Sequence, residues 1–407
     1  MVDVLDVRLG GKRVGAITAL GGDRSIFTFD DAYAEDLQRP TLSLSFKSQT
    51  GGLIREHNST QTRLLPFFSN LLPEGRLRDY LAKRAGLKAS REFFLLWALG
   101  ADLPGGVTIG SADGEPPPAG IGAGEDDAGQ ANRPRRILRF SLAGVQLKFS
   151  ALAGPKKGLI ISVHGDGGDW IVKLPSAQYA GVSENEFSMM SLAGAIGIEV
   201  PEIALLSLDD IDGLPGDIGR LDGGVFAIRR FDRLKSGERI HMEDFAQVFG
   251  LYPEDKYKKA SYRSIAGVIW RETGETGLVE FVRRLVFNAL IGNADMHLKN
   301  WSLLYRDGVN ATLAPAYDFV ATQAYIPDDK AALKVVRSSR WTDLGRDELV
   351  EMSRKAGLPE ELVLRTAADT VAAFRQAWGK EHAGLPLDQA AIDVVETQLK
   401  TVPLAQV

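Results

Sequence analysis

The first hundred residues carry two kinds of hydrophobic pattern. Apolar and polar positions alternate over residues 3–10 and 14–29, around two glycine pairs, which predicts short, half-buried strands joined by tight turns. From residue 64 to residue 99 the apolar spacing becomes helical, with proline and glycine near the predicted starts and stops. These patterns predict a first α+β unit at residues 1–110.

Residues 111–136 carry almost no large apolar side chains. They contain three consecutive prolines, several glycines and an acidic cluster at residues 125–127, so they cannot bury enough surface to offset the entropy of ordering. The run Gly120 to Gly124 superficially resembles a dinucleotide-binding loop, but no predicted strand precedes it and no apolar helix follows it. The segment is therefore predicted to be a flexible linker without a cofactor role.

The segment 137–235 is rich in predicted strands. Apolar runs at Leu159 to Val163 and at Trp170 to Leu174 flank a glycine-rich turn, which predicts a β-hairpin. A helix should follow, because Ser183 and Glu186 fit a capping box ahead of an apolar run. This segment is therefore predicted to be a second, mainly β unit.

Residues 236–407 have a mostly helical apolar period. A loop-and-strand region from Gly292 to about Val336 interrupts it, and the chain has no internal repeat. With 407 residues and 44% apolar content, the chain exceeds what one hydrophobic core usually serves. The sequence therefore predicts an α+β protein of two or three folded units.

Composition narrows the functional classes. The formal net charge is -5, from 48 basic and 53 acidic side chains, which gives no general attraction to nucleic acids or anionic lipids. The absence of cysteine excludes disulfides, thiolate zinc sites and cysteine nucleophiles, and the five histidines lack a zinc-binding spacing. Since no apolar stretch is long enough to cross a bilayer and the N-terminus lacks an uninterrupted apolar region, we expect a cytoplasmic protein without a membrane partner.

The segment from Phe287 to Asn300 carries the strongest candidate chemistry. An apolar helix is predicted to end at Gly292, and polar residues follow where burial alone would require none. Asp295 and Asn300 have the Asp-x-x-x-x-Asn spacing of a kinase catalytic loop, in which a carboxylate orients and deprotonates the attacking hydroxyl and an amide oxygen holds Mg²⁺. The same spacing also occurs in ordinary turns and caps, so it does not decide the function alone.

Three further features follow the order of kinase motifs. Asp318 directly precedes Phe319, like the magnesium-binding Asp-Phe pair of kinases, although Val320 replaces the usual glycine. Lys173 interrupts a predicted strand and would need an anionic partner if buried; the alternative is a lysine on an exposed strand face. Upstream, residues 141–148 form a small-residue turn that can bring backbone amides close to phosphate. No Walker A sequence suggests another phosphate chemistry.

Two groups of charged residues have more than one interpretation. Glu184 and Glu186 could supply an ion-pair partner for Lys173, as a helix glutamate does in protein kinases, or could simply favour a helix N-terminus electrostatically. The basic run from Lys256 to Arg263 could contact an acidic or RNA-bound substrate, although a solvated loop is the more usual explanation. Both questions depend on tertiary contacts.

In combination, the motifs of this chain resemble those of HipA serine/threonine kinases. The matching segments are Ser-Leu-Ala-Gly-Val-Gln at 141–146, Ile-Val-Lys-Leu-Pro at 171–175, Glu-Asn-Glu at 184–186, Arg-Phe-Asp-Arg at 230–233, Glu-Asp-Phe-Ala-Gln at 243–247, Gly-Asn-Ala-Asp-Met-His-Leu-Lys-Asn at 292–300 and Leu-Ala-Pro-Ala-Tyr-Asp at 313–318. Residues 66–75 are similar to part of that family's N-terminal subdomain. The resemblance covers nearly the whole chain.

This resemblance implies a two-lobed, protein-kinase-like α+β fold. Residues 1–110 would form the N-terminal subdomain and residues 111–136 a flexible linker. Residues 137–235 would form a β-rich lobe with the nucleotide loop, and residues 236–407 a helical lobe with the catalytic loop. ATP and Mg²⁺ would then bind between the two lobes.

The resemblance also implies a role for each matching residue. Asp295 would be the catalytic base, and Asn300 and Asp318 would hold Mg²⁺. Ser141 matches the family's autophosphorylated serine, whose modification holds the phosphate loop outside the pocket and switches the kinase off. Lys173 would bind the ATP phosphates. The other residues implied at the site are His297 and Lys299 of the catalytic loop, Ala143, Gly144, Val145, Gln146 and Lys148 of the nucleotide loop, and Arg229 and Phe231 of the hinge.

By the same resemblance, the chain would be the toxin of a type II toxin–antitoxin pair. It would transfer the γ-phosphoryl group of ATP to a protein, such as an aminoacyl-tRNA synthetase, and so favour dormancy. A HipB-like helix-turn-helix antitoxin would be its partner, and the chain would reach DNA mainly through that partner. Two alternatives remain open: a small-molecule kinase on the same fold, and a catalytically silent protein that binds its antitoxin as a co-repressor.

Overall fold

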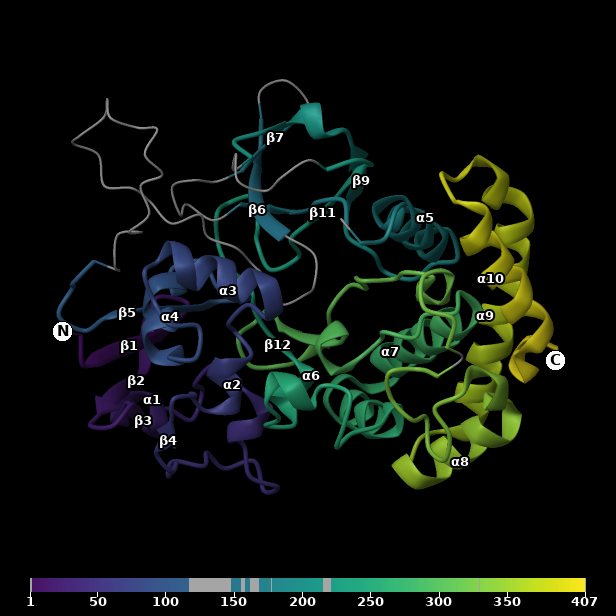
Figure 1. Ribbon diagram of the computed structural model, residues 1–407. Helices are drawn as coiled ribbons and strands as arrows, with labels where there is room; N and C mark the ends of the chain where they lie inside the picture. Colours follow the sequence, from purple (N-terminus) through teal and green to yellow (C-terminus); the bar gives the residue numbers. More distant parts are fainter. Residues whose placement is uncertain are drawn as a thin grey trace.

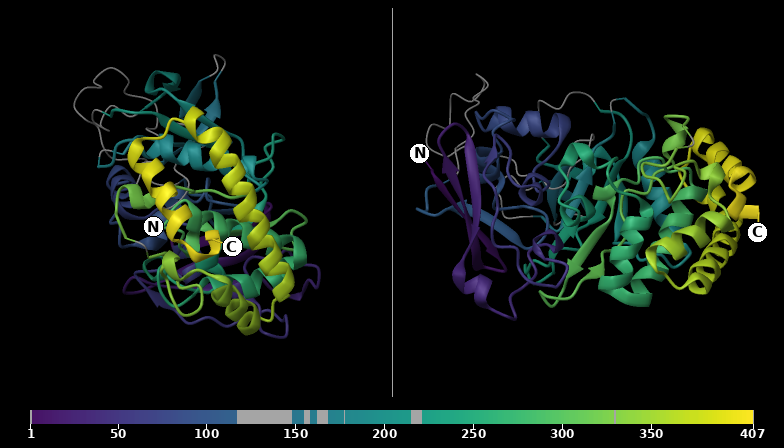
Figure 2. Two further views of the ribbon diagram at one scale, coloured as in Figure 1. Left: turned by 90° about the vertical axis from the view of Figure 1, so that its right-hand side faces the viewer. Right: turned by 90° about the horizontal axis from the view of Figure 1, so that it is seen from below.

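The computed structural model describes residues 2–116, 148–154, 158–161, 168–176, 178–214, 221–328 and 330–406. An N-terminal unit lies at one end of the molecule, a β-rich lobe beside it, and a helical lobe carries the C-terminus at the other end (Figure 1). The view from below shows the same order along the long direction (Figure 2, right). Five predicted nucleotide-loop residues lie outside the described residues: Ser141, Ala143, Gly144, Val145 and Gln146. So does most of the predicted linker.

The N-terminal unit is built on a five-stranded antiparallel sheet in the order β4-β3-β2-β1-β5. Its strands are β1 (Val4–Leu9), β2 (Lys12–Leu20), β3 (Arg24–Phe29), β4 (Thr60–Gln61) and β5 (Val107–Ser111). Its helices are α1 (Asp31–Glu35), α2 (Pro66–Ser69), α3 (Gly75–Arg84) and α4 (Glu92–Leu99). The strands and helices expected from the apolar spacing of this region are therefore present.

The β-rich lobe is a six-stranded sheet in the order β10-β7-β6-β8-β11-β9. Its strands are β6 (Lys148–Ala153), β7 (Leu159–Ile161), β8 (Trp170–Lys173), β9 (Ile203–Leu206), β10 (Ile211–Asp212) and β11 (Val225–Arg229). The predicted hairpin of β7 and β8 is wrong, because both strands pair with β6 on opposite edges. The apolar runs identified two strands, but their spacing could not show that an earlier strand inserts between them.

Helix α5 (Val182–Ala195) follows this sheet, but its predicted capping box is absent. The N-cap is Gly181 in the left-handed region, with a φ of 74°, so Ser183 lies inside the helix. The Ser183 hydroxyl has no hydrogen-bond partner among the described residues, and the Glu186 carboxylate is an ion-pair partner of Lys173. The prediction was wrong because the helix begins at Val182, one residue before Ser183, so the Ser183 side chain cannot act as the N-cap.

The helical lobe surrounds the long helix α7 (Tyr262–Leu290), which has a kink at Gly274. Its other helices are α6 (Phe245–Val248), α8 (Arg346–Ala356), α9 (Glu360–Glu381) and α10 (Gln389–Thr401), and its small sheet contains β12 (His241–Asp244), β13 (Ser302–Tyr305) and β14 (Thr312–Leu313). Helices α9 and α10 form the outer edge of the molecule (Figure 1). None of the helices in the described ranges has the length and apolar character needed to cross a membrane.

The six-stranded sheet separates two hydrophobic cores. Val172 and Ala227 pack with the N-terminal unit, whereas their neighbours Ile171 and Ile228 pack with the helical lobe. Successive strand residues point to opposite faces, and both faces are covered, which explains the continuous apolar runs in these strands. The N-terminal unit and the β-rich lobe therefore share one core.

A buried carboxyl group, that of Glu243 in β12, joins the helical lobe to the N-terminal unit. Ser43 Oγ donates to Glu243 Oε2 at 2.5 Å, and Leu44 N donates to Oε1 at 3.0 Å. Burial raises the pKa of Glu243 to about 7, although these hydrogen bonds and one from Tyr305 favour the charged form. The carboxyl therefore changes its charge near neutral pH.

We expect Glu243→Gln to reduce the loss of stability between pH 5 and pH 8. A raised pKa in the folded state gives stability that is complete below the ordinary pKa of 4.5 and is lost as the pH rises through about 7. Glutamine stays neutral and can donate to Ser43, so the variant should become more stable than the parent at pH 8, by up to roughly 3 kcal/mol. Urea unfolding at both pH values measures this, with the exposed Glu56→Gln as control. Identical pH profiles for the parent and Glu243→Gln would contradict it.

Candidate active site

The predicted catalytic loop begins where α7 ends. Gly292 follows the C-cap residue Ile291 with a φ of 65°, and a Cβ added there would lie 2.6 Å from Val394 Cγ1. Only glycine combines this backbone conformation with the close approach of α10. The helix therefore ends at a fixed point, and the loop with Asp295 starts there, as the sequence predicted.

Asp295 and Asn300 are held together by the loop itself. Asn300 Nδ2 donates to the Asp295 carbonyl oxygen at 3.0 Å, so its Oδ1 remains as the atom suited to ligate a cation. The Asp295 carboxylate has an exposed face, and the Tyr257 hydroxyl donates to its Oδ1 at 2.6 Å. Surrounding protein raises the pKa of Asp295 above its ordinary value, and the Tyr257 hydrogen bond opposes that rise.

Asp318 lies next to this loop in an unusual backbone conformation. Its φ of 59° is in the left-handed region, which aspartate tolerates better than most residues and which is often found at functional sites. Asn293 connects it to the catalytic loop, because Nδ2 donates to the Asp318 carbonyl oxygen at 3.3 Å while Oδ1 accepts from Asp295 N at 3.0 Å. The two predicted aspartates are therefore neighbours through one asparagine side chain.

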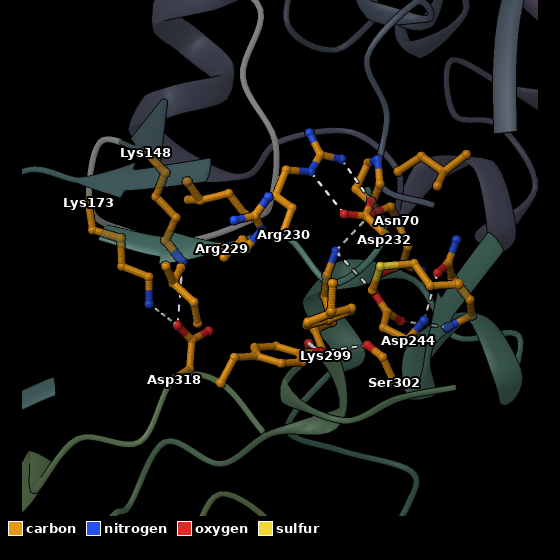
Figure 3. A pocket seen from close by; sticks show the side chains of 18 residues that line it. Asn70, Lys148, Lys173, Arg229, Arg230, Asp232, Asp244, Lys299, Ser302 and Asp318 are labelled. Atoms are coloured by element: carbon orange, nitrogen blue, oxygen red, sulfur yellow. Dashed lines mark hydrogen bonds and ion pairs between the residues drawn. The ribbon is translucent and has the colours of Figure 1, made fainter. Parts of the chain in front are cut away.

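Two buried lysines point from the sheet toward Asp318 (Figure 3). Lys148 on β6 and Lys173 on β8 are direct cross-strand neighbours. Lys148 Nζ lies 3.7 Å from Asp318 Oδ1, and Lys173 Nζ forms ion pairs with both Asp318 and Glu186. Like charges placed opposite each other destabilise a sheet, so this arrangement requires anions. Sequence order alone did not reveal that the two lysines are paired.

The charges at this site shift several pKa values. Burial disfavours the carboxylate of Asp318, but Lys148 and Lys173 outweigh it and hold its pKa well below the ordinary range. Burial lowers the pKa of Lys148, and Lys173 adds to that effect while Asp318 opposes it. For Lys173, the two carboxylates overcome burial and raise the pKa. The site therefore holds a charged carboxylate at Asp318 and a charged ammonium group at Lys173, which pair with each other.

Three consecutive residues of α5 each fix a different part of the site. Glu184 Oε1 accepts from Gly224 N at 2.7 Å, and Asn185 Oδ1 accepts from Ala321 N at 2.8 Å. Glu186 pairs with Lys173. Of the two interpretations of these glutamates, the ion pair is correct for Glu186, and Glu184 instead holds the turn before β11. Asn185 fixes the segment that follows Asp318.

A pocket lies between the six-stranded sheet, the catalytic loop and the N-terminal unit. Its empty space, counted together with the solvent in its open mouth, is about 860 Å³. Its lining includes six predicted residues: Lys148, Lys173, Arg229, Phe231, Lys299 and Asp318. Asp295, His297 and Asn300 are not part of this lining; Asp295 and Asn300 are linked to Asp318 through the loop contacts described above. The pocket is therefore lined by Lys299 and Asp318 and is linked to Asp295 and Asn300 through the loop.

The predicted hinge forms one wall of the pocket. The Arg229 guanidinium pairs with Asp169 at 3.0 Å and with Glu202 at 3.2 Å, so its charge is already balanced by two carboxylates. The Phe231 ring packs against the Tyr317 ring, with centroids 5.7 Å apart. An aromatic wall of this kind suits a flat, apolar base.

Several pocket residues were not assigned a role from the sequence. Asp244 and Gln247 line the pocket and form a reciprocal capping box at the start of α6. Tyr317 also lines it, and its hydroxyl donates to the Lys299 carbonyl oxygen at 2.9 Å. All three lie in motifs at 243–247 and 313–318 that resemble those of HipA kinases, so their positions in these motifs could have identified them as site residues. Tyr257, which binds Asp295, carried no such signal.

The side chains of His297 and Lys299 are both buried by surrounding protein. His297 is buried, burial lowers its pKa to about 3, and its Nδ1 has no hydrogen-bond partner within the described part of the chain. It is therefore neutral at ordinary pH. Lys299 Nζ donates to the Asn70 carbonyl oxygen at 3.0 Å and lies 2.9 Å from Glu74 Oε1, so the N-terminal unit already holds its charge.

The residues present fit a magnesium ion bound mainly through a nucleotide. Asp318 supplies a carboxylate and Asn300 an amide oxygen, which are the oxygen ligands that Mg²⁺ prefers beside substrate phosphates. Across the described ranges, no group of three or more histidine, aspartate or glutamate side chains could hold a metal by itself. A cation at this site would therefore depend on the phosphates for its remaining ligands.

Comparisons with known proteins identify related sequences over nearly the whole chain. The family model for a HipA-like C-terminal domain matches residues 140–378, and that for a HipA N-terminal domain matches residues 5–110. The candidate kinase Y4dM of Sinorhizobium fredii is 51% identical over 99% of this chain and 98% of its own. The serine/threonine-protein kinase toxin HipA of Shewanella oneidensis is 26% identical, over 79% of this chain and 76% of its own.

A solved structure confirms the predicted fold class. HipA from Shewanella oneidensis, in a complex with HipB and its operator DNA, matches with a TM-score of 0.72 at 21% identity, covering 99% of this chain and 96% of that one. The α+β, two-lobed, kinase-like architecture is therefore shared over nearly the whole length.

Proposed function

The chain belongs to the HipA family of kinases, and from this premise we propose that it is a Mg²⁺-ATP-dependent serine/threonine protein kinase. The observation that supports this most strongly is the pair of buried lysines on neighbouring strands, Lys148 and Lys173, which both face Asp318. Asp318 and Glu186 balance their charges in the present structure, and a triphosphate would take the place of Asp318 beside the two ammonium groups. Asp295 lies beside this anion site, connected to Asp318 through Asn293.

In the proposed reaction, the hydroxyl oxygen of a serine or threonine attacks the γ-phosphorus of ATP. The bond to the leaving ADP oxygen breaks, and the hydroxyl proton passes to the Asp295 carboxylate. Lys148 and Lys173 would bind the phosphates and release Asp318 from its present ion pairs. Asp318 and Asn300 would then hold Mg²⁺, which balances the charge of the phosphates. Phe231 and Tyr317 would contact the adenine ring.

We further propose that the chain is the toxin of a toxin–antitoxin pair in the cytoplasm. Its similarity to the Shewanella oneidensis toxin HipA, and to the structure of that toxin with HipB and operator DNA, supports this role. A HipB-like antitoxin would be the partner, DNA would be reached mainly through it, and a protein such as an aminoacyl-tRNA synthetase would be the target. Ser141, which lies outside the described residues, would be the site of self-modification.

Intact mass spectrometry after incubation with Mg²⁺-ATP tests this proposal. We expect the parent to gain a phosphoryl group and Ser141→Ala to show no such gain, while the parent and Ser141→Ala both bind ATP in calorimetry. ATP consumption with a metabolite and no labelled protein would indicate a small-molecule kinase. A folded chain that binds no nucleotide would contradict the proposal and favour the antitoxin-binding co-repressor.

A further inference from the structure

Glu74 of the N-terminal unit contacts two lysines of the helical lobe. It is the N-cap residue of α3, without a side-chain capping hydrogen bond. Its Oε2 accepts a hydrogen bond from Lys256 Nζ at 2.8 Å, and its Oε1 lies 2.9 Å from Lys299 Nζ. The Glu74 side chain is 19% exposed, against 14% for Lys256 and 6% for Lys299. One largely buried carboxylate therefore bridges two largely buried ammonium groups.

The two lysines lie in the two segments that flank the proposed catalytic base. Lys299 belongs to the catalytic loop, directly before Asn300. Lys256 precedes Tyr257, whose hydroxyl donates to Asp295 Oδ1, and the Lys256 carbonyl oxygen accepts from Leu298 N at 3.3 Å. A shift of either lysine would therefore move a group that contacts Asp295 or Asn300.

We propose that Glu74 is a positioning residue of the active site, which fixes the catalytic loop from outside the kinase lobes by holding Lys256 and Lys299 together. This inference rests on the proposed kinase function. Without the carboxylate, Lys299 would keep only the Asn70 carbonyl oxygen and Asp244, whose Oδ2 is 3.7 Å away. A buried ammonium group with so few partners would move toward water. The N-terminal unit is thus a part of the catalytic machinery, and not an appendage to it.

This role is separable from the general attachment of the N-terminal unit. That attachment already has a shared hydrophobic core and a buried carboxyl contact at Glu243. Glu74 differs from both because its partners are the segments beside Asp295. Its removal should therefore affect turnover much more than folding or ATP binding.

Glu74→Gln tests the proposal with steady-state kinetics of protein phosphorylation. We expect kcat to fall by roughly 10- to 100-fold, as small misplacements of catalytic groups do, while the KM for ATP and the calorimetric ATP affinity change little. Circular dichroism would show that the variant is folded at the assay temperature. The control is Glu56→Gln, an exposed glutamate of the same unit, which should leave kcat unchanged.

A double-mutant cycle then identifies the path of the effect. If Glu74 acts through Lys299, the combination Glu74→Gln with Lys299→Met should be about as slow as Lys299→Met alone. The inference would be overturned if the losses in kcat of the two single variants multiply in the double variant, or if Glu74→Gln has the kcat of the parent. A parent protein that transfers no phosphoryl group would instead count against the proposed function. The two failures are therefore distinguishable.

Discussion

Asp295→Asn should lower the rate of phosphoryl transfer by roughly 10²- to 10⁴-fold and leave the affinity for ATP nearly unchanged. Asparagine keeps the acceptor for the Tyr257 hydroxyl, and Asn300 binds the backbone carbonyl of residue 295, so the loop should keep its shape. What the variant loses is a group that can accept a proton. Single-turnover transfer of labelled phosphate and calorimetric ATP binding measure the two quantities.

The matched control for this variant is Asp369→Asn. Asp369 lies exposed on α9, in the same lobe but away from the pocket lining, so the change removes the same charge without touching the site. We expect Asp369→Asn to transfer phosphate at the rate of the parent. An Asp295→Asn protein that transfers phosphate at the rate of the parent would show that another group accepts the proton.

A buried cluster of four charged side chains lies where the N-terminal unit meets the hinge. Arg230 forms ion pairs with Asp102 at 3.1 Å and with Asp232 at 2.8 Å, and Arg233 pairs with the same two aspartates at 3.0 and 2.8 Å. Gly105 N also donates to Asp232 Oδ2 at 2.7 Å. All four side chains are almost fully buried, and their charges cancel.

Asp102→Asn should therefore destabilise the protein by roughly 3–5 kcal/mol, because it leaves two buried guanidinium groups with Asp232 as their one remaining carboxylate in the cluster. This one substitution would weaken three hydrogen bonds to Asp102, which come from Ser150 on β6, from Arg230 and from Arg233. Urea unfolding measures the change in the free energy of unfolding. It also tests whether the N-terminal unit and the β-rich lobe unfold together, as their shared core suggests.

Two variants make this prediction specific. Asp113→Asn changes an exposed aspartate of the same region and should alter stability by less than about 0.5 kcal/mol. Adding Arg233→Met to Asp102→Asn restores the charge balance and should recover part of the loss. If Asp102→Asn behaves like Asp113→Asn, the cluster contributes nothing to the attachment of the N-terminal unit.

Local patterns of the sequence were sufficient for the elements and for the order of the site motifs. The alternation that predicted the first strands and the helical spacing from residue 64 to residue 99 both act over a few neighbouring residues, which a sequence displays directly. The spacing of Asp295 and Asn300, and the pairing of Asp318 with Phe319, are equally local. The resemblance of these motifs to those of HipA kinases implied the kinase-like fold, which the comparison with a solved structure confirms.

Contacts between residues far apart in the sequence could not be predicted from these local patterns. The apolar runs of β7 and β8 suggested a hairpin, yet β6 lies between them, since strand periodicity defines faces and not neighbours. Glu186 fitted a helix cap as well as an ion pair, and only the position of Lys173 decided between the two. Glu74 lay in a recognisable motif, but nothing near it in the sequence indicated Lys256 or Lys299.

Neighbouring residues in the chain were enough to indicate which segments form strands and helices and which residues carry the candidate chemistry. The folded packing was needed to show which charges meet: Lys148 with Lys173 and Asp318, and Asp102 with the two arginines beside the hinge. Propensity and periodicity are set within a few residues. A buried charge, in contrast, is stable only beside a partner, and the packing of the whole chain determines where that partner lies.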